Sequence, residues 1–102
     1  MKEHANITVT ERGTFLVSGD LTFATVALLL DEGERLLAGI NAPVIDLSEV
    51  THSDSAGLAL LLEWLDRGQA QGAQIRFRHL PESLLRIARL SNLDSLLPVA
   101  EE

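Results

Sequence analysis

The 102-residue chain has no cysteine and no tyrosine, and only 4% of its residues are aromatic. The absence of cysteine excludes a disulfide framework, a thiolate nucleophile and a cysteine-based metal site. With so few aromatic rings, Leu, Val, Ile and Ala must fill the core, and apolar residues make up 46% of the chain. This length and composition predict one folded domain over residues 1–102, with a core from about 7 to 98.

Positive charge is also scarce, because eight Lys and Arg residues stand against fifteen Asp and Glu, for a net charge of −7. Nucleic acids and anionic membrane surfaces both attract clustered basic residues, so neither is an expected partner. No apolar run approaches the length of a membrane span, and the first residues lack an apolar signal region. We therefore expect a soluble cytoplasmic protein with no direct membrane insertion.

The first half of the chain contains patterns typical of a hairpin followed by a helix. Residues 7–11 and 14–18 alternate between apolar and polar, and two residues ending in glycine separate them, which predicts a β-hairpin. A period of 3.6 then predicts a helix from about residue 23 to 37. The predicted inward face of this helix comprises Phe23, Val26, Ala27, Leu30 and Leu37.

The second half predicts two strand–helix units. Residues 44–47 are almost uninterrupted apolar, as in a central strand covered on both faces, and a polar loop leads to a helix over 55–71. Residues 75–78 read as an edge strand, and Pro81 opens a third helix. A last short strand and an extended tail are both compatible with residues 95–99. The predicted fold class is a single-domain α/β sandwich, whose mixed sheet combines the hairpin with parallel strands and about three helices.

The second helix carries an unusual apolar surface. On a helical wheel Leu58, Leu61, Leu62 and Leu65 form the core stripe, and Leu60 and Arg67 fall on the opposite side with Trp64 beside them. Two interpretations stay open for this outward side. Either Trp64 folds over the rim of the core, or the side is a partner-binding face, in which Trp and Arg are enriched.

The start of this helix is the candidate functional corner, because the first helical N–H groups lack partners and carry partial positive charge. Asp54 is expected to cap the helix. A serine nucleophile at Ser55 would need an oriented histidine base, and nothing in the sequence directs His52 toward it. Without metal-ligand spacing or a phosphate-binding loop, we expect no enzyme, metal or cofactor. Phosphorylation of Ser55 remains an alternative, although Asp54 would repel the phosphate.

Three segments resemble the STAS domain family: Gly19-Asp20-Leu21, Val44-Ile45-Asp46-Leu47-Ser48 and Asp54-Ser55-Ala56-Gly57-Leu58. The resemblance runs from about residue 7 to 98. In one branch, the anti-sigma-factor antagonists, the serine matching Ser55 is phosphorylated and switches partners. In the MlaB-type branch the matching residue contacts an ATPase subunit. Residues 57–62 and 88–93 are more similar to the second branch.

The resemblance implies a non-catalytic accessory subunit of a bacterial phospholipid-transport ABC complex that maintains outer-membrane lipid asymmetry. The implied partner is the ABC-transporter ATPase subunit, in complex with a permease and a membrane-anchored lipid-binding subunit, at the cytoplasmic face of the inner membrane. The alternative is an anti-sigma-factor antagonist switched by phosphorylation of Ser55. The predicted partner-binding residues are Ser53, Asp54, Ser55, Ala56, Leu60, Trp64 and Arg67.

Overall fold

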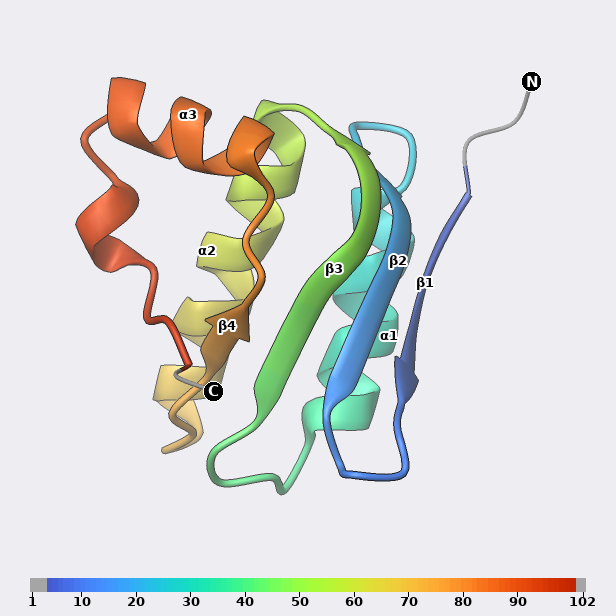
Figure 1. Ribbon diagram of the computed structural model, residues 1–102. Helices are drawn as coiled ribbons and strands as arrows, with labels where there is room; N and C mark the ends of the chain where they lie inside the picture. Colours follow the sequence, from blue (N-terminus) through green and yellow to red (C-terminus); the bar gives the residue numbers. More distant parts are fainter. Residues whose placement is uncertain (1–3, 101–102) are drawn as a thin grey trace.

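Four strands form one mixed sheet in the computed structural model, which describes residues 4–100 (Figure 1). The strands lie in chain order, and the first two form the antiparallel hairpin that the sequence predicts. The second, third and fourth strands pair in parallel, as two crossover connections require. Their bounds are β1 (Ala5–Val9), β2 (Phe15–Leu21), β3 (Val44–Ser53) and β4 (Arg76–Arg78).

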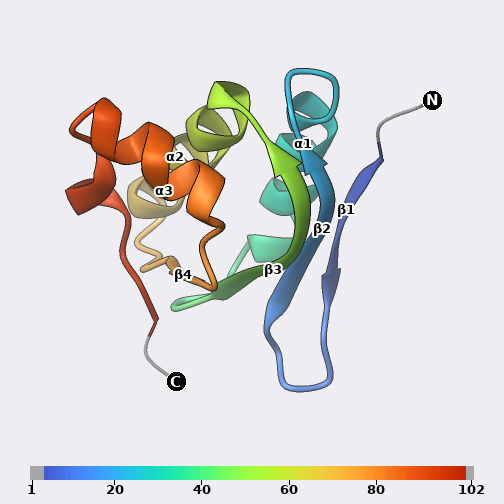
Figure 2. The same cartoon turned by 45° about the horizontal axis from the view of Figure 1, so that its top comes forward.

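Three helices accompany the sheet, which confirms the predicted α/β class. They are α1 (Val26–Leu37), α2 (Ser55–Ala70) and α3 (Glu82–Leu90). Helices α1 and α2 lie side by side on one face of the sheet, and α3 packs against α2 near the end of β3 (Figures 1 and 2). Within residues 4–100 no helix has the length and apolarity to cross a membrane.

The core lies between this helical layer and one face of the sheet. Ile45 and Leu47 of β3 are buried, whereas the alternating residues Val44 and Asp46 are only half-buried. Strand β3 is central, between β2 and β4, as predicted, but the prediction that both of its faces are covered is wrong. Because a strand turns successive side chains to opposite faces, only every second residue of β3 reaches the helices.

Strand β3 is also longer than predicted, since it continues through the segment 48–53 that the sequence pattern assigned to a loop. The extension pairs with the end of β2, where Glu49 lies opposite Ser18 and Ser53 lies opposite Leu21. Backbone pairing does not require apolar side chains, so polarity alone gave the wrong end of the strand. The hairpin connection is likewise longer than two residues, running from 10 to 14.

The inward face of α1 differs from the prediction. Leu29 is fully buried, whereas Phe23 is 87% exposed. The helix begins only at Val26, after a turn over residues 22–25, so Phe23 does not share the helical phase from which its direction was predicted. Val26 and Leu30 are partly buried against the core.

The C-terminal part contains the predicted third helix, and the structure decides between the two alternatives for residues 95–99, a short strand or an extended tail. Helix α3 begins after Pro81 and buries Leu84 and Ala88. A 3₁₀ turn (Asp94–Leu96) follows, and the chain then runs parallel to β4, with a single bridge between Phe77 and Val99. The tail is therefore extended and adds one rung beside β4 without forming a full strand.

Candidate functional site

The junction between β3 and α2 is organised by Asp54, whose side chain caps the helix as predicted. One carboxylate oxygen accepts the N–H of Ala56 at 2.8 Å, and the other accepts the N–H of Phe23 at 3.4 Å. The backbone N–H of Asp54 donates to the carbonyl of Leu21 at 3.1 Å. One residue thus joins the start of α2 to the turn that precedes α1.

Ser55 is the exposed first residue of α2, so its hydroxyl is open to an approaching protein. Ser53 is half-buried and its Oγ lies 2.5 Å from the Oγ of Ser83, in the first turn of α3. The starts of α2 and α3 consequently meet at the same corner, which comes forward in Figure 2. The structure brings Ser53, Asp54, Ser55 and Ala56 together there.

Two predicted site residues do not face outward. Leu60 is 4% exposed and Trp64 is 2% exposed, so the assignment of both side chains to an outward face of α2 is wrong. A helical wheel that allows for one buried face does not describe α2, because α2 packs along α1 as well as on the sheet. A helix that packs on both a sheet and a neighbouring helix buries two of its sides. The ring of Trp64 lies so close to Gly33 of α1 that a Cβ added to this glycine would be 2.6 Å from Nε1 of Trp64.

A mostly apolar groove runs between α1 and α2 from the Asp54 corner. Its α1 side is lined by Phe23, Val26, Ala27 and Leu30, and its α2 side by Ala56, Ala59, Leu60, Glu63 and Arg67. Three of the predicted residues therefore share this groove, since Leu60 forms part of its lining. Phe23 was missed because its apolar side chain assigned it to the core and the predicted helix began at this residue, whereas α1 begins only at Val26.

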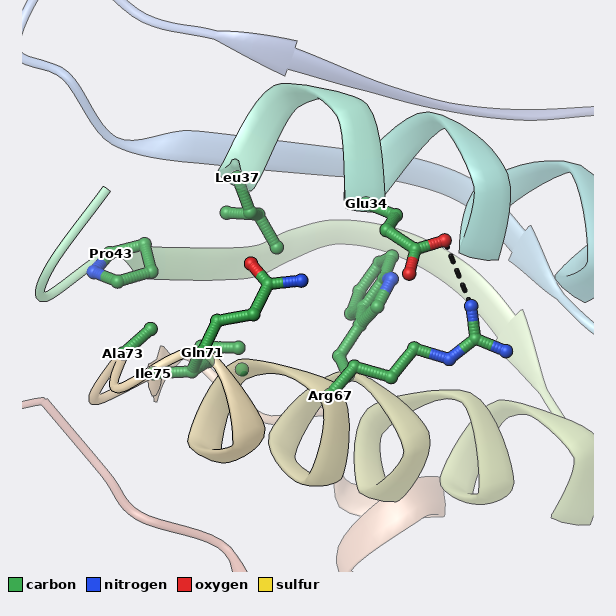
Figure 3. A pocket seen from close by; sticks show the side chains of 9 residues that line it. Glu34, Leu37, Pro43, Arg67, Gln71, Ala73 and Ile75 are labelled. Atoms are coloured by element: carbon green, nitrogen blue, oxygen red, sulfur yellow. Dashed lines mark hydrogen bonds and ion pairs between the residues drawn. The ribbon is translucent and has the colours of Figure 1, made fainter. Parts of the chain in front are cut away.

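Arg67 closes the far end of the groove by an ion-pair network between the two helices. Its Nη1 donates to Glu34 of α1 at 2.9 Å (Figure 3). Its Nε donates to Glu63 of α2, also at 2.9 Å. The hydrogen bond that Arg67 donates to Glu63 raises the pKa of Arg67 most, partial desolvation opposes this change, and the charge of Glu34 raises the pKa further. Because all three side chains are more than a third exposed, the network positions α1 on α2 with a modest effect on stability.

His52 points to a different carboxylate, since its Nδ1 lies 3.1 Å from Oδ1 of Asp20. The same oxygen accepts the hydroxyl of Thr51 at 3.0 Å. The Thr51 hydrogen bond has the largest effect and lowers the pKa of Asp20. Burial opposes it, and the hydrogen bond and charge of His52 lower the pKa further. His52 and Asp20 thus form a pair of their own on the neighbouring strands β3 and β2.

Sequence comparison places the chain among known proteins. A family described as "Mlab, STAS domain" matches residues 8–98. The intermembrane phospholipid transport system binding protein MlaB of Escherichia coli K12 is 34% identical over 80 residues, which are 78% of this chain and 80% of that protein. The protein of the same name from Shigella flexneri matches equally.

Two solved structures share the fold at low identity. The anti-sigma factor antagonist SpoIIAA in its unphosphorylated form aligns with a TM-score of 0.71 at 14% identity, over 97% of this chain and 90% of that one. A putative anti-sigma factor antagonist from Thermotoga maritima aligns with a TM-score of 0.74 at 18% identity, over 96% and 86%. With its family match over most of its length and this fold, the chain belongs to the STAS domain family and is of the MlaB type.

Proposed function

We propose that this protein is a non-catalytic accessory subunit of a bacterial phospholipid-transport ABC complex of the Mla type. It binds the cytoplasmic ATPase subunit through the start of α2 and the adjoining α1–α2 surface. The permease and the membrane-anchored lipid-binding subunit complete the complex, and this chain stays at the cytoplasmic face through the ATPase alone. The observation that carries the proposal is the 34% identity to a phospholipid transport system binding protein over four-fifths of its length.

The arrangement of the corner supports a binding role. Ser55 is exposed, and the Asp54 cap fixes the backbone around it. The nearest histidine in sequence, His52, is paired with Asp20, which leaves Ser55 without the oriented base that nucleophilic catalysis needs. A fixed backbone carrying an exposed small side chain suits a contact surface.

An accessory subunit of this kind acts by mass action. A domain that binds only the folded ATPase stabilises it by RT ln(1 + [L]/Kd), which is about 2.7 kcal/mol at a concentration one hundred times Kd. The small size and fixed geometry of this chain suit that role, because little conformational entropy is lost on docking. We expect the ATPase to be less stable and less abundant in cells that lack this chain.

Replacement of Ser55 by arginine tests the docking site. Ser55→Arg places a long charged side chain at the start of α2, and we expect it to abolish co-purification with the ATPase subunit while the thermal melting curve is unchanged. The matched control is Ser95→Arg, at an exposed position in the 3₁₀ turn. Equal recovery of the ATPase with Ser55→Arg and with wild type would rule out this corner as the docking site.

The alternative function is that of an anti-sigma-factor antagonist switched at Ser55. Its support is the exposure of this hydroxyl at a helix start, where a kinase can reach it and free N–H groups would stabilise the phosphate. The neighbouring Asp54 carboxylate opposes this charge. Mass spectrometry of the protein from its native cells would test it, since Ser55 found unmodified under every growth condition would eliminate the switch.

A further inference from the structure

The geometry points to the α1–α2 groove as the seat of one amphipathic helix of the ATPase subunit, with Phe23 as the principal anchor and Asp54 as the residue that positions it. This inference rests on the proposed function, because it takes the ATPase as the partner. It goes further by naming the occupant and by extending the contact from α2 to the turn before α1.

The groove has the shape that a helix needs. Its α2 wall runs from Ala56 to Arg67, a rise of about 16.5 Å, which corresponds to about three helical turns. The middle of the groove is lined by small side chains, Ala27 on one wall and Ala59 on the other, so another backbone can approach closely. A third helix laid between two neighbouring helices would place its apolar stripe on Leu30 and Leu60.

Phe23 stands at the open end of the groove as a prepared anchor. Its side chain is 87% exposed, while the backbone that carries it is held on both sides. Its N–H donates to Asp54, and the neighbouring Thr22 N–H donates to the hydroxyl of Thr25, which is itself buried and donates to the carbonyl of Asp20. An exposed aromatic ring on a fixed turn loses little entropy when a partner covers it, which is the property of a binding hot spot.

Charge determines the kind of helix that fits. Helices α1 and α2 together carry five carboxylates and only two arginines. One of these, Arg67, is already shared between Glu34 and Glu63 at the groove. The complementary occupant therefore has an apolar stripe flanked by Lys or Arg. The same negative charge disfavours an anionic phospholipid, and it disfavours a second copy of this acidic chain.

The binding experiment uses the full chain and the purified ATPase subunit, with Kd measured by isothermal titration calorimetry. We expect Phe23→Ala to weaken binding at least about tenfold with an unchanged melting temperature, since the ring contacts little in the free protein. The matched control is Leu90→Ala, at an 82% exposed leucine at the end of α3. Unchanged affinity for Phe23→Ala, or an equal loss for Leu90→Ala, would overturn the groove as the seat.

Photo-crosslinking identifies the occupant. A benzoylphenylalanine at position 59 should crosslink to one ATPase segment with an apolar stripe and basic flanks, whereas the same probe at Thr8 on the open face of the sheet should not. Crosslinks from position 59 to a second copy of this chain or to phospholipid would refute the inference. If wild type itself does not bind the ATPase, the proposed function fails; if it binds but position 59 gives no crosslink, only the groove assignment fails.

Discussion

Replacement of Gly33 by alanine tests the packing of α1 on α2, because close packing predicts that the free energy of unfolding falls and loose packing predicts that it rises. A Cβ at this position would lie 2.6 Å from Nε1 of Trp64 and 2.7 Å from two carbons of the same ring, whereas ordinary contact begins at 3.4 Å. The buried, rigid ring would have to move by about 0.8 Å or the helices would have to separate. Such overpacking costs about 1–3 kcal/mol, and the better helix propensity of alanine returns about 1 kcal/mol.

We therefore expect Gly33→Ala to lower the free energy of unfolding by about 1 kcal/mol. Urea denaturation followed by fluorescence measures this directly, because Trp64 is the only tryptophan in the chain and there is no tyrosine. The control is Gly68→Ala in α2, where the closest atom to the new Cβ is the flexible Cδ1 of Ile75, and we expect a smaller loss. If Gly33→Ala stabilised the protein by the propensity gain alone, the close contact between the helices would be refuted.

Two further predictions concern carboxylates. Asp54→Ala removes the cap and the acceptor of the Phe23 N–H, so we expect a loss of about 1–2 kcal/mol in urea denaturation; Asp54→Asn, which can still cap, should lose less, and equal effects would contradict the capping role. Asp20 has a folded-state pKa below its ordinary value of 3.8, so its stabilising contribution is present above about pH 4 and is lost as pH falls through the lowered pKa. Melting temperatures from pH 2.5 to 7 should therefore fall less steeply in acid for Asp20→Asn than for wild type, and parallel curves would refute this.

Local rules predicted the parts of the fold that depend on local chemistry. The start of α2 followed from Asp54, because a capping side chain acts within two residues of itself. The start of α3 followed from Pro81, because the helix begins at the next residue, Glu82. Two strand–helix units imposed the parallel pairing whatever the detailed packing.

Most of the errors share one physical cause: a sequence pattern does not reveal which further element a helix packs against or a strand pairs with. Leu60 and Trp64 are buried where α2 packs against α1, and the apolar periodicity of α2 alone cannot indicate where α1 lies. Polar residues 48–53 belong to a strand because the end of β2 offers them backbone partners. Phe23 was assigned to the core for its apolar side chain, although the turn before α1 carries it out to the solvent.

For the proposed docking surface, the sequence indicated the corner at the start of α2 but not the contribution of α1 to the groove. The segment from Ser53 to Ala56 was identified from a strand-to-helix junction, which any α/β chain can display in its pattern. The contribution of α1 to the groove depends on the packing angle and register of two helices, and these are set by long-range contacts such as the ring of Trp64 on Gly33.

The bridge between the C-terminal tail and β4 makes the two edges of the sheet differ in how readily they could pair with another copy of the protein. The N–H of Phe77 donates to the carbonyl of Pro98 and its carbonyl accepts the N–H of Ala100, both at 2.8 Å. The tail therefore occupies the outward backbone groups at the centre of a three-residue strand, where a strand of another molecule could otherwise add. A chain truncated after Leu97 would lose these two hydrogen bonds. The backbone groups of Phe77 would then be open to pairing with a strand of another molecule, so the solubility of the truncated chain at high concentration would depend on the exposed edge of β4.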